Sequence, residues 1–112
     1  MPNQQSDLDR LFHALADPTR RAVVARLAEG VATTSALAEP FEMALPSFTQ
    51  HMAVLERAGL VASEKRGRVR TYALRPRALA DAEIWLSGRR AFWEARLDQL
   101  DAFLLSKRGD GE

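Results

Sequence analysis

The sequence has 112 residues, of which 46% are hydrophobic and 28% charged, an ordinary balance for one folded domain. It contains no cysteine, which excludes disulfides, thiolate metal sites and cysteine redox sensing. The N-terminal residues are polar and no apolar run is long enough to span a bilayer, so a cytoplasmic protein without membrane association is expected. The formal net charge is only +1, but cations are concentrated in residues 65–75.

The first helix is expected to begin after a disordered tail at residues 1–5, with Ser6 or Asp7 as its N-cap. His13 follows its apolar stripe and is interpreted as a surface or hydrogen-bonded histidine, because no second metal ligand lies three or four residues away. The apolar positions repeat at helical spacing: Leu8, Leu11, Phe12 and Leu15.

A second helix is predicted from Asp17-Pro18, which reads as a cap followed by the first helical position. It should continue to about Glu29 and end at Gly30, and its buried residues should be Val23, Val24 and Leu27. Arg20 and Arg21 have two interpretations, contact with phosphate or pairing with carboxylates of neighbouring helices.

A short third helix is predicted at residues 34–39, because Pro40 disfavours helical geometry in the residue before it. Thr33 or Thr34 would cap this helix. The same threonines are candidate phosphate contacts, since free N–H groups at a helix N-terminus favour an anion. This helix, a turn at residues 40–44 and a helix from Leu45 form a helix-turn-helix pair.

The helix at residues 45–58 has one apolar face, made by Phe48, Met52 and Leu55. The opposite face and its flanks carry no carboxylate, so this face could enter a DNA major groove. Those positions are Pro46, Thr49, Gln50, Ala53 and Arg57, with Ser47 and His51 on the flanks.

Gly59 ends that helix, and two strands are predicted at residues 60–63 and 69–74, joined by a turn at residues 65–68. One acid, Glu64, accompanies five cations in this segment: Lys65, Arg66, Arg68, Arg70 and Arg75. A basic turn alone is more often a solvated loop, but directly after a helix with an acid-free polar face it favours nucleic-acid binding. The expected fold is a mainly α winged helix-turn-helix in the order α-α-α-α-β-β-α, with the hairpin as its wing.

The last helix is predicted at residues 76–107, with Gly88 as a candidate kink or break and residues 108–112 as a disordered tail. A helix of about 30 residues is on the order of 45 Å long, more than the small domain covers, so dimerisation through the first and last helices is expected. A ligand box made by Trp85, Phe92 and Trp93 is the alternative. The expected interface residues are Leu8, Leu11, Phe12, Leu79, Trp85, Leu86, Phe92, Trp93, Leu97, Leu100 and Leu104.

With these features described, the chain resembles the ArsR (SmtB/ArsR) family of winged-helix transcriptional repressors over about residues 8–104. The motifs that carry the resemblance are LADPTRR at 15–21, LPSFTQHM at 45–52, LERAGLV at 55–61 and GRVRTY at 67–72. The resemblance implies a homodimer on a partly palindromic operator, with Ser47, Thr49 and Gln50 at base edges and the wing arginines on the backbone. It also implies that His51 serves packing.

The sequence departs from the metal-sensing members, which carry cysteines on the third helix or acid and histidine ligands on the last one. No metal and no cofactor is therefore expected, and the signal implied by the resemblance is a small organic molecule or a partner protein. Ala44 stands where relatives often have a capping serine, at a cost of about 1 kcal/mol in helix stability.

Taken together, the sequence predicts a sequence-specific regulator that binds double-stranded DNA. The alternative is a protein-interaction module that uses the aromatic last helix and does not bind DNA. An enzyme is not expected, because no phosphate loop, nucleophile elbow or paired catalytic acids are recognisable. The predicted DNA-binding residues are Thr33, Thr34, Pro46, Ser47, Thr49, Gln50, Arg57, Lys65, Arg66, Arg68 and Arg70.

Overall fold

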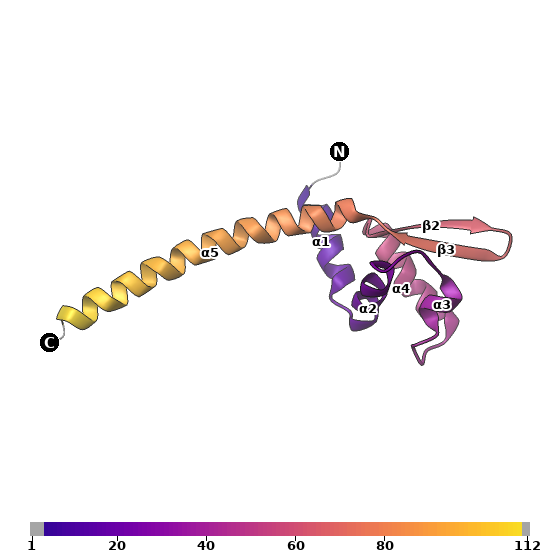
Figure 1. Ribbon diagram of the computed structural model, residues 1–112, viewed down its shortest axis with the longest axis horizontal. Coiled ribbons are helices and arrows are strands. Elements are labelled where there is room, and N and C mark those ends of the chain that lie inside the picture. The colour runs from indigo at the N-terminus through magenta and orange to yellow at the C-terminus, as the bar shows by residue number, and fades with distance from the viewer. Residues whose placement is uncertain (1–3, 111–112) are drawn as a thin grey trace. The chain divides into compact units, whose positions relative to one another are not determined.

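The computed structural model describes residues 4–110 and divides into two compact units, the first up to Ala80 and the second from Asp81 (Figure 1). Each unit is described by itself. In chain order the elements are α1 (Gln4–Leu15), α2 (Pro18–Leu27), β1 (Ala32–Thr33), α3 (Thr34–Ala38), α4 (Leu45–Arg57), β2 (Val61–Arg66), β3 (Val69–Leu74) and α5 (Pro76–Asp110). The helix-turn-helix and the hairpin are confirmed, in the predicted order.

The core of the first unit is built on α4. Phe48, Met52 and Leu55 have no exposed area, which confirms the apolar face predicted for this helix. The ring of Phe41, in the turn before α4, stacks on Phe48 with the ring centroids 5.8 Å apart. Val23 of α2 and Leu37 of α3 are also buried core residues. Burial of one face leaves the opposite face of α4 to solvent.

Two predicted caps are present. Asp17 accepts a hydrogen bond at its Oδ2 from the backbone N–H of Arg20 (3.0 Å), with Pro18 at the first position of α2. Thr33, and not Thr34, caps α3, because its Oγ1 accepts from the N–H of Ala36 (3.2 Å). Both capping residues have extended backbone angles, which lets their side chains turn back to the free N–H groups.

Several predicted boundaries are wrong by a turn or less. The first helix already begins at Gln4, so Ser6 and Asp7 lie within its first turn and are not N-caps. α2 ends at Leu27 rather than at Glu29, and Val24 is half-buried rather than buried. Helix ends are poorly fixed by periodicity, because the last turn has fewer hydrogen bonds to hold it. Of the two predicted tails, residues 1–3 and 111–112 lie outside the described residues.

The sheet has three antiparallel strands in the order β1-β3-β2. β1 was not predicted. It is two residues long, too short for alternation to be visible in the sequence, and it pairs Ala32 with Tyr72 and Thr33 with Thr71. The β2–β3 register runs from Val61↔Leu74 to Arg66↔Val69.

The hairpin turn is shorter than predicted. It consists of Gly67 and Arg68 alone, so Lys65 and Arg66 belong to β2 and not to the turn. Gly67 has φ of 63°, and no residue other than glycine among those described has a positive φ. A positive φ at only the first central residue is typical of a type II′ turn, whose twist matches that of the flanking strands. The turn thus places Arg68 at the end of the wing.

α5 is continuous through Gly88, so the helix is not broken at this residue. It also runs past Lys107, the predicted end, to Asp110. Within the second unit most of its large apolar side chains are exposed, from Ile84 to Leu105. No helix in residues 4–110 has the length and apolar character needed to cross a membrane.

Candidate nucleic-acid interface

The first turns of α4 present a polar surface without an acid. Pro46, Ser47, Thr49 and Gln50 are all exposed, on the side of the helix away from the buried Phe48. The hydroxyl of Thr49 donates to the carbonyl oxygen of Pro46 (2.9 Å), which leaves its oxygen lone pairs available as acceptors. Ala53, further along the helix, is half-buried. This surface offers hydrogen-bonding groups of the kinds that read base edges.

The N-terminus of α4 has no side-chain cap. Ala44 has extended backbone angles, and no side-chain hydrogen bond closes the helix, as its methyl group dictates. The carbonyl of Ala44 accepts from the N–H of Phe48 (3.1 Å), so the helix itself is regular from its first turn. The first N–H groups of the helix carry a partial positive charge next to the exposed Ser47.

Arg57 lies away from that surface. It is on the last turn of the 13-residue helix, about 16 Å along the axis from Pro46 at 1.5 Å per residue. There it lines an open depression between α1 and α4 together with Arg10, His13, Val54 and Ala58. The structure therefore does not bring Arg57 together with the other predicted residues of α4.

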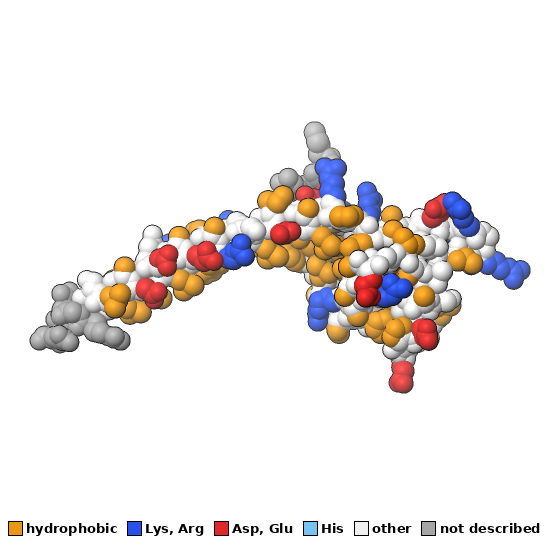
Figure 2. Space-filling view, in the orientation of Figure 1, with side chains coloured by type: hydrophobic (Ala, Val, Ile, Leu, Met, Phe, Trp, Pro, Cys, Tyr) orange, Lys and Arg blue, Asp and Glu red, His pale blue; other side chains and the backbone are white. Residues whose placement is uncertain are grey.

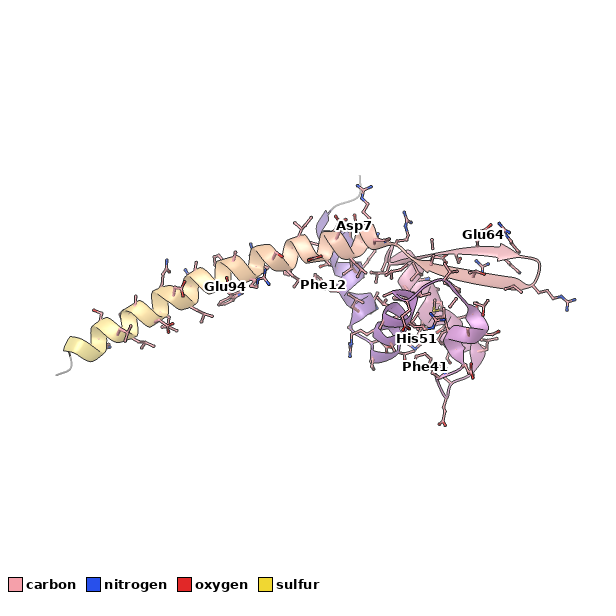
Figure 3. The ribbon with its side chains drawn as sticks, viewed as in Figure 1. Asp7, Phe12, Phe41, His51, Glu64 and Glu94 are labelled. Atoms are coloured by element: carbon pink, nitrogen blue, oxygen red, sulfur yellow. The ribbon has the colours of Figure 1, made fainter. Side chains whose placement is uncertain are left out.

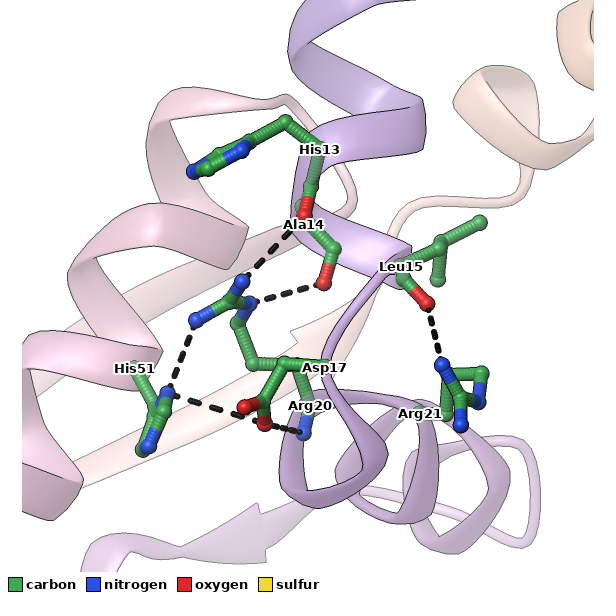
Figure 4. Close-up of polar contacts among 7 residues, drawn as sticks. All are labelled: His13, Ala14, Leu15, Asp17, Arg20, Arg21 and His51. Atoms are coloured by element: carbon green, nitrogen blue, oxygen red, sulfur yellow. Dashed lines mark hydrogen bonds and ion pairs between the residues drawn. The ribbon is translucent and has the colours of Figure 1, made fainter.

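Arg20 fastens α2 to the end of α1 and to α4 (Figure 4). Its Nε donates to the carbonyl of Ala14 (2.7 Å) and its Nη2 to the carbonyl of His13 (3.2 Å). Its Nη1 lies 2.9 Å from Nδ1 of His51. Carbonyls in the last turn of a helix have no hydrogen-bond donor within the helix. A guanidinium has five N–H donors, so it can bond several of these carbonyls at once.

Arg21 also connects α2 to the end of α1, through a single hydrogen bond. Its Nη1 donates to the carbonyl of Leu15 (2.9 Å), the last residue of α1. Of the two interpretations of Arg20 and Arg21, the structure supports the structural one. The partners are backbone carbonyls and a histidine, however, and not the carboxylates expected from the sequence.

His51 joins α4 to this cluster. Its Nδ1 can accept from Arg20 only when it carries no proton, and the same atom lies 3.9 Å from Oδ2 of Asp17. At Asp17, burial raises the pKa, but the hydrogen bond from the Arg20 N–H, the charge of His51 when it is protonated and the charge of Arg20 outweigh it and hold the pKa of the carboxyl below its usual value. His51 is half-buried, which agrees with the packing role predicted for it.

The wing cations fall into two groups. Lys65 and Arg68 are exposed and make no hydrogen bond or ion pair with the described residues. Arg66 pairs with Glu64 (Nε to Oε1, 3.2 Å), and both side chains are exposed. Figure 2 shows cationic side chains at the free end of the hairpin, and Figure 3 shows Glu64 on the side of the hairpin facing away from the helices. The free cations are therefore at and beside the turn.

Arg70, Thr33 and Thr34 are engaged within the protein. Nη1 of Arg70 donates to Oγ of Ser63 (2.7 Å), and the Arg70 carbonyl accepts a long hydrogen bond from Oγ1 of Thr34 (3.4 Å). Thr33 uses its hydroxyl as the α3 cap. Both threonines are half-buried, so capping and packing account for them without a phosphate.

The predicted interface residues differ in exposure. Leu11 is only 4% exposed and is a core residue of the first unit, which corrects its assignment, whereas Leu8, Phe12 and Leu79 are half-buried. From Trp85 onwards on α5 the predicted residues are all exposed, between 42% for Trp85 and 60% for Trp93. Arg89 lies over the rings of both Trp85 and Phe92, with its guanidinium carbon 5.9 and 5.5 Å from the ring centroids.

Sequence reasoning missed two residues near the wing, Ser63 and Glu56. Oγ of Ser63 donates to Oε1 of Glu56 on α4 (2.6 Å). The register of the hairpin is the signal that points to Ser63, because pairing with the buried Tyr72 puts it on the inner face of the strand. Among residues 4–110 no group of three or more metal-ligating side chains is present.

Comparison with known proteins places this geometry in a family. A family model described as a helix-turn-helix domain matches residues 15–64. The "HTH-type transcriptional regulator Rv2034" of Mycobacterium tuberculosis is 39% identical over 102 residues, which are 91% of this chain and 92% of the relative. The "Transcriptional repressor SdpR" of Bacillus subtilis is 30% identical over 79 residues, which are 70% of this chain and 88% of the relative.

A crystal structure of an "ArsR family transcriptional regulator" is similar to this chain in both fold and sequence. It is 48% identical, has a TM-score of 0.79, and the match covers 84% of this chain and 97% of that chain. The acid-free surface of α4, the basic hairpin beside it and these relatives all favour DNA binding over the interaction-module alternative. The chain therefore belongs to the ArsR family of winged helix-turn-helix proteins, which are DNA-binding regulators of transcription.

Proposed function

We propose that this protein is a homodimeric repressor that places α4 in the major groove and the tip of its wing on the phosphate backbone or in the minor groove. The observation that carries the proposal is the exposed, acid-free surface of Pro46, Ser47, Thr49 and Gln50, which lies in the same unit as a hairpin with unpaired cations. Base edges give sequence preference, whereas phosphate contacts give affinity and register.

Each exposed residue of α4 has a distinct chemical use. The Gln50 amide can both donate and accept, the combination that pairs with the N6 and N7 atoms of adenine. Ser47 and Thr49 supply hydroxyls to bases or phosphates, and Pro46 supplies an apolar contact for a thymine methyl group. Because Arg57 lies on the last turn of α4, we assign it at most a secondary contact.

On the wing, we assign phosphate contacts first to Lys65 and Arg68, which make no hydrogen bond or ion pair with residues 4–110 that DNA binding would have to break. Arg66 joins them at the cost of its exposed pair with Glu64, which is worth little in water. Thr33 and Thr34 contribute through the position of α3 rather than through free hydroxyls.

The homodimer is supported by the apolar surface of α5. A lone helix that leaves Trp93, Leu97, Leu100 and Leu104 about half exposed or more has a large apolar area to bury against a second copy. A two-fold dimer presents two equivalent α4 helices, which suits an operator with two related half-sites about one helical turn apart. Such a regulator acts where the chromosome is, so we place it in the cytoplasm. Since the chain has no cysteine thiolates, we expect its signal to be an organic molecule or a partner protein.

The test is fluorescence anisotropy with duplex DNA from upstream of the protein's own gene, measured over a salt series and against random DNA. Gln50→Ala should lose preference for the specific duplex, at about 1–3 kcal/mol per lost base contact. Arg68→Ala should weaken binding to both duplexes and make the salt slope shallower by about 1.8, because each protomer of the dimer loses one phosphate contact.

The matched control is Arg26→Ala, which removes an exposed arginine of α2 whose side chain reaches only the carbonyl of Gly30 (3.5 Å). It removes the same charge as Arg68→Ala, so it controls for net charge and should leave the slope unchanged. Equal binding of specific and random DNA by the unmodified protein would overturn the proposal.

A further inference from the structure

A line of hydrogen bonds ties the wing to both helices of the helix-turn-helix. Thr34, the first residue of α3, donates to the Arg70 carbonyl on β3 (3.4 Å), and the Arg70 guanidinium donates to Ser63 on β2 (2.7 Å). The Ser63 hydroxyl donates in turn to Glu56 on α4 (2.6 Å). These four residues come from four different elements, α3, β3, β2 and α4.

The register of the hairpin explains why these side chains meet. Ser63 pairs with Tyr72, and Arg70 is two residues before Tyr72, so all three lie on the same face of the hairpin. Tyr72 is buried, which identifies that face as the one towards the core. Burial raises the pKa of Tyr72, while the Arg70 charge opposes and the Glu56 charge adds to the rise, in keeping with charged groups gathered around one ring.

Arg70 therefore differs from the other wing cations. Lys65 and Arg68 have no partner in the part of the chain that the structure describes, and Arg66 pairs with Glu64 on the outer face. The Arg70 guanidinium is directed along the inner face to Ser63, whose hydroxyl links it to the Glu56 carboxylate. To bind a phosphate, the Arg70 guanidinium would have to give up its hydrogen bond to the Ser63 hydroxyl, which is also bonded to the Glu56 carboxylate.

We infer that Arg70 is a positioning residue: with Ser63 and Glu56 it forms a strap that sets the wing relative to α4, so that the free cations of the wing and the reading surface engage one duplex together. The inference rests on the proposed DNA-binding function and adds three residues to it. A two-stranded hairpin is marginally stable alone, so fixed attachments are needed to hold its tip in one place. Hydrogen bonds to charged groups are the strong ones, and both main links of the strap have a charged partner.

The inference is tested by comparing DNA affinity with its salt slope. Arg70→Ala, Ser63→Ala and Glu56→Gln should each weaken specific binding by about tenfold, as expected for loss of one exposed hydrogen bond in each protomer of the dimer. Because no phosphate contact is lost, each should keep the salt slope of the unmodified protein. The double variant of Ser63→Ala with Arg70→Ala should lose no more than either single variant, since both break the same line.

Two variants serve as controls. Ser63→Thr keeps a hydroxyl on a strand-compatible side chain and should restore binding. Glu64→Gln removes a carboxylate from the same hairpin but from its outer face, where it pairs with Arg66, and should not weaken binding. If Arg70→Ala makes the salt slope shallower by about 1.8, one phosphate contact in each protomer, while Ser63→Ala has no effect, Arg70 is a phosphate contact and the strap is overturned.

A measurement without DNA separates this inference from the proposed function. In the free protein, Ser63→Ala and Glu56→Gln should speed hydrogen exchange of hairpin amides by about tenfold, whereas Glu64→Gln should not. Unchanged exchange in the strap variants overturns the inference even if DNA binding holds. Absence of specific binding by the unmodified protein, with faster exchange in the strap variants, overturns only the proposed function.

Discussion

Replacing Arg20 by alanine should cost more stability than any other single arginine substitution on α2. The change removes three side-chain hydrogen bonds at once, to the carbonyls of His13 and Ala14 and to Nδ1 of His51. Two of these bonds are partly buried, so water only partly replaces them. These bonds connect α2 with α1 and with α4, so their loss weakens both helix contacts.

The magnitude follows from the partners. A hydrogen bond to a charged group is worth about 1.5–3 kcal/mol, and bonds that share one side chain are not additive. Discounting the exposed bond to His13, we expect a loss of about 2–4 kcal/mol. Against a typical total stability of about 5–15 kcal/mol, this is a large fraction.

The assay is urea denaturation at one fixed protomer concentration, because dimer stability depends on concentration. With a slope of about 2 kcal/mol per molar, typical of a small domain in urea, the midpoint for Arg20→Ala should fall by about 1–2 M. Arg21→Ala is the matched control, since that neighbouring, exposed arginine makes one bond, to the Leu15 carbonyl, and should cost less than about 1 kcal/mol. Equal shifts for the two variants would refute the role given to Arg20.

Three other predictions concern the caps and the last helix. The pKa of Asp17 is lowered in the folded protein, so its contribution to the unfolding free energy is fully present above about pH 4. This contribution should be lost as the pH falls through the pKa of Asp17 in the folded state. Asp17→Ala should therefore flatten the acid side of a profile of stability against pH. Ala44→Ser should raise the unfolding free energy by about 1 kcal/mol by supplying the missing cap of α4, and no change in the urea midpoint would contradict this. Leu97→Asp should weaken dimerisation by about 100-fold in sedimentation equilibrium, since each of two half-exposed leucines loses about 1–1.5 kcal/mol of burial. Ile84→Asp is its control, because Ile84 is exposed and lies about 140° around the helix from Leu97, and it should have little effect; equal effects would argue against the predicted interface.

Much of the fold was predictable because the signals are local. The buried face of α4 follows from the spacing of Phe48, Met52 and Leu55, and the start of α2 follows from the Asp17-Pro18 pair. The hairpin follows from alternation on either side of Gly67. In each case neighbouring residues carry both the pattern and its physical cause.

The sequence by itself therefore determined the helix order, the polar surface of α4 and the basic character of the wing, because these depend on periods of a few residues. It did not determine β1, which exists only through pairing with β3. Nor did it identify the side-chain partners of Arg20 and Arg70: His51 is 31 residues from Arg20, and Ser63 meets Arg70 only in the register that joins β2 to β3. Whether an arginine meets a carbonyl, a hydroxyl or solvent is set by how the elements pack, and only the tertiary structure contains that information.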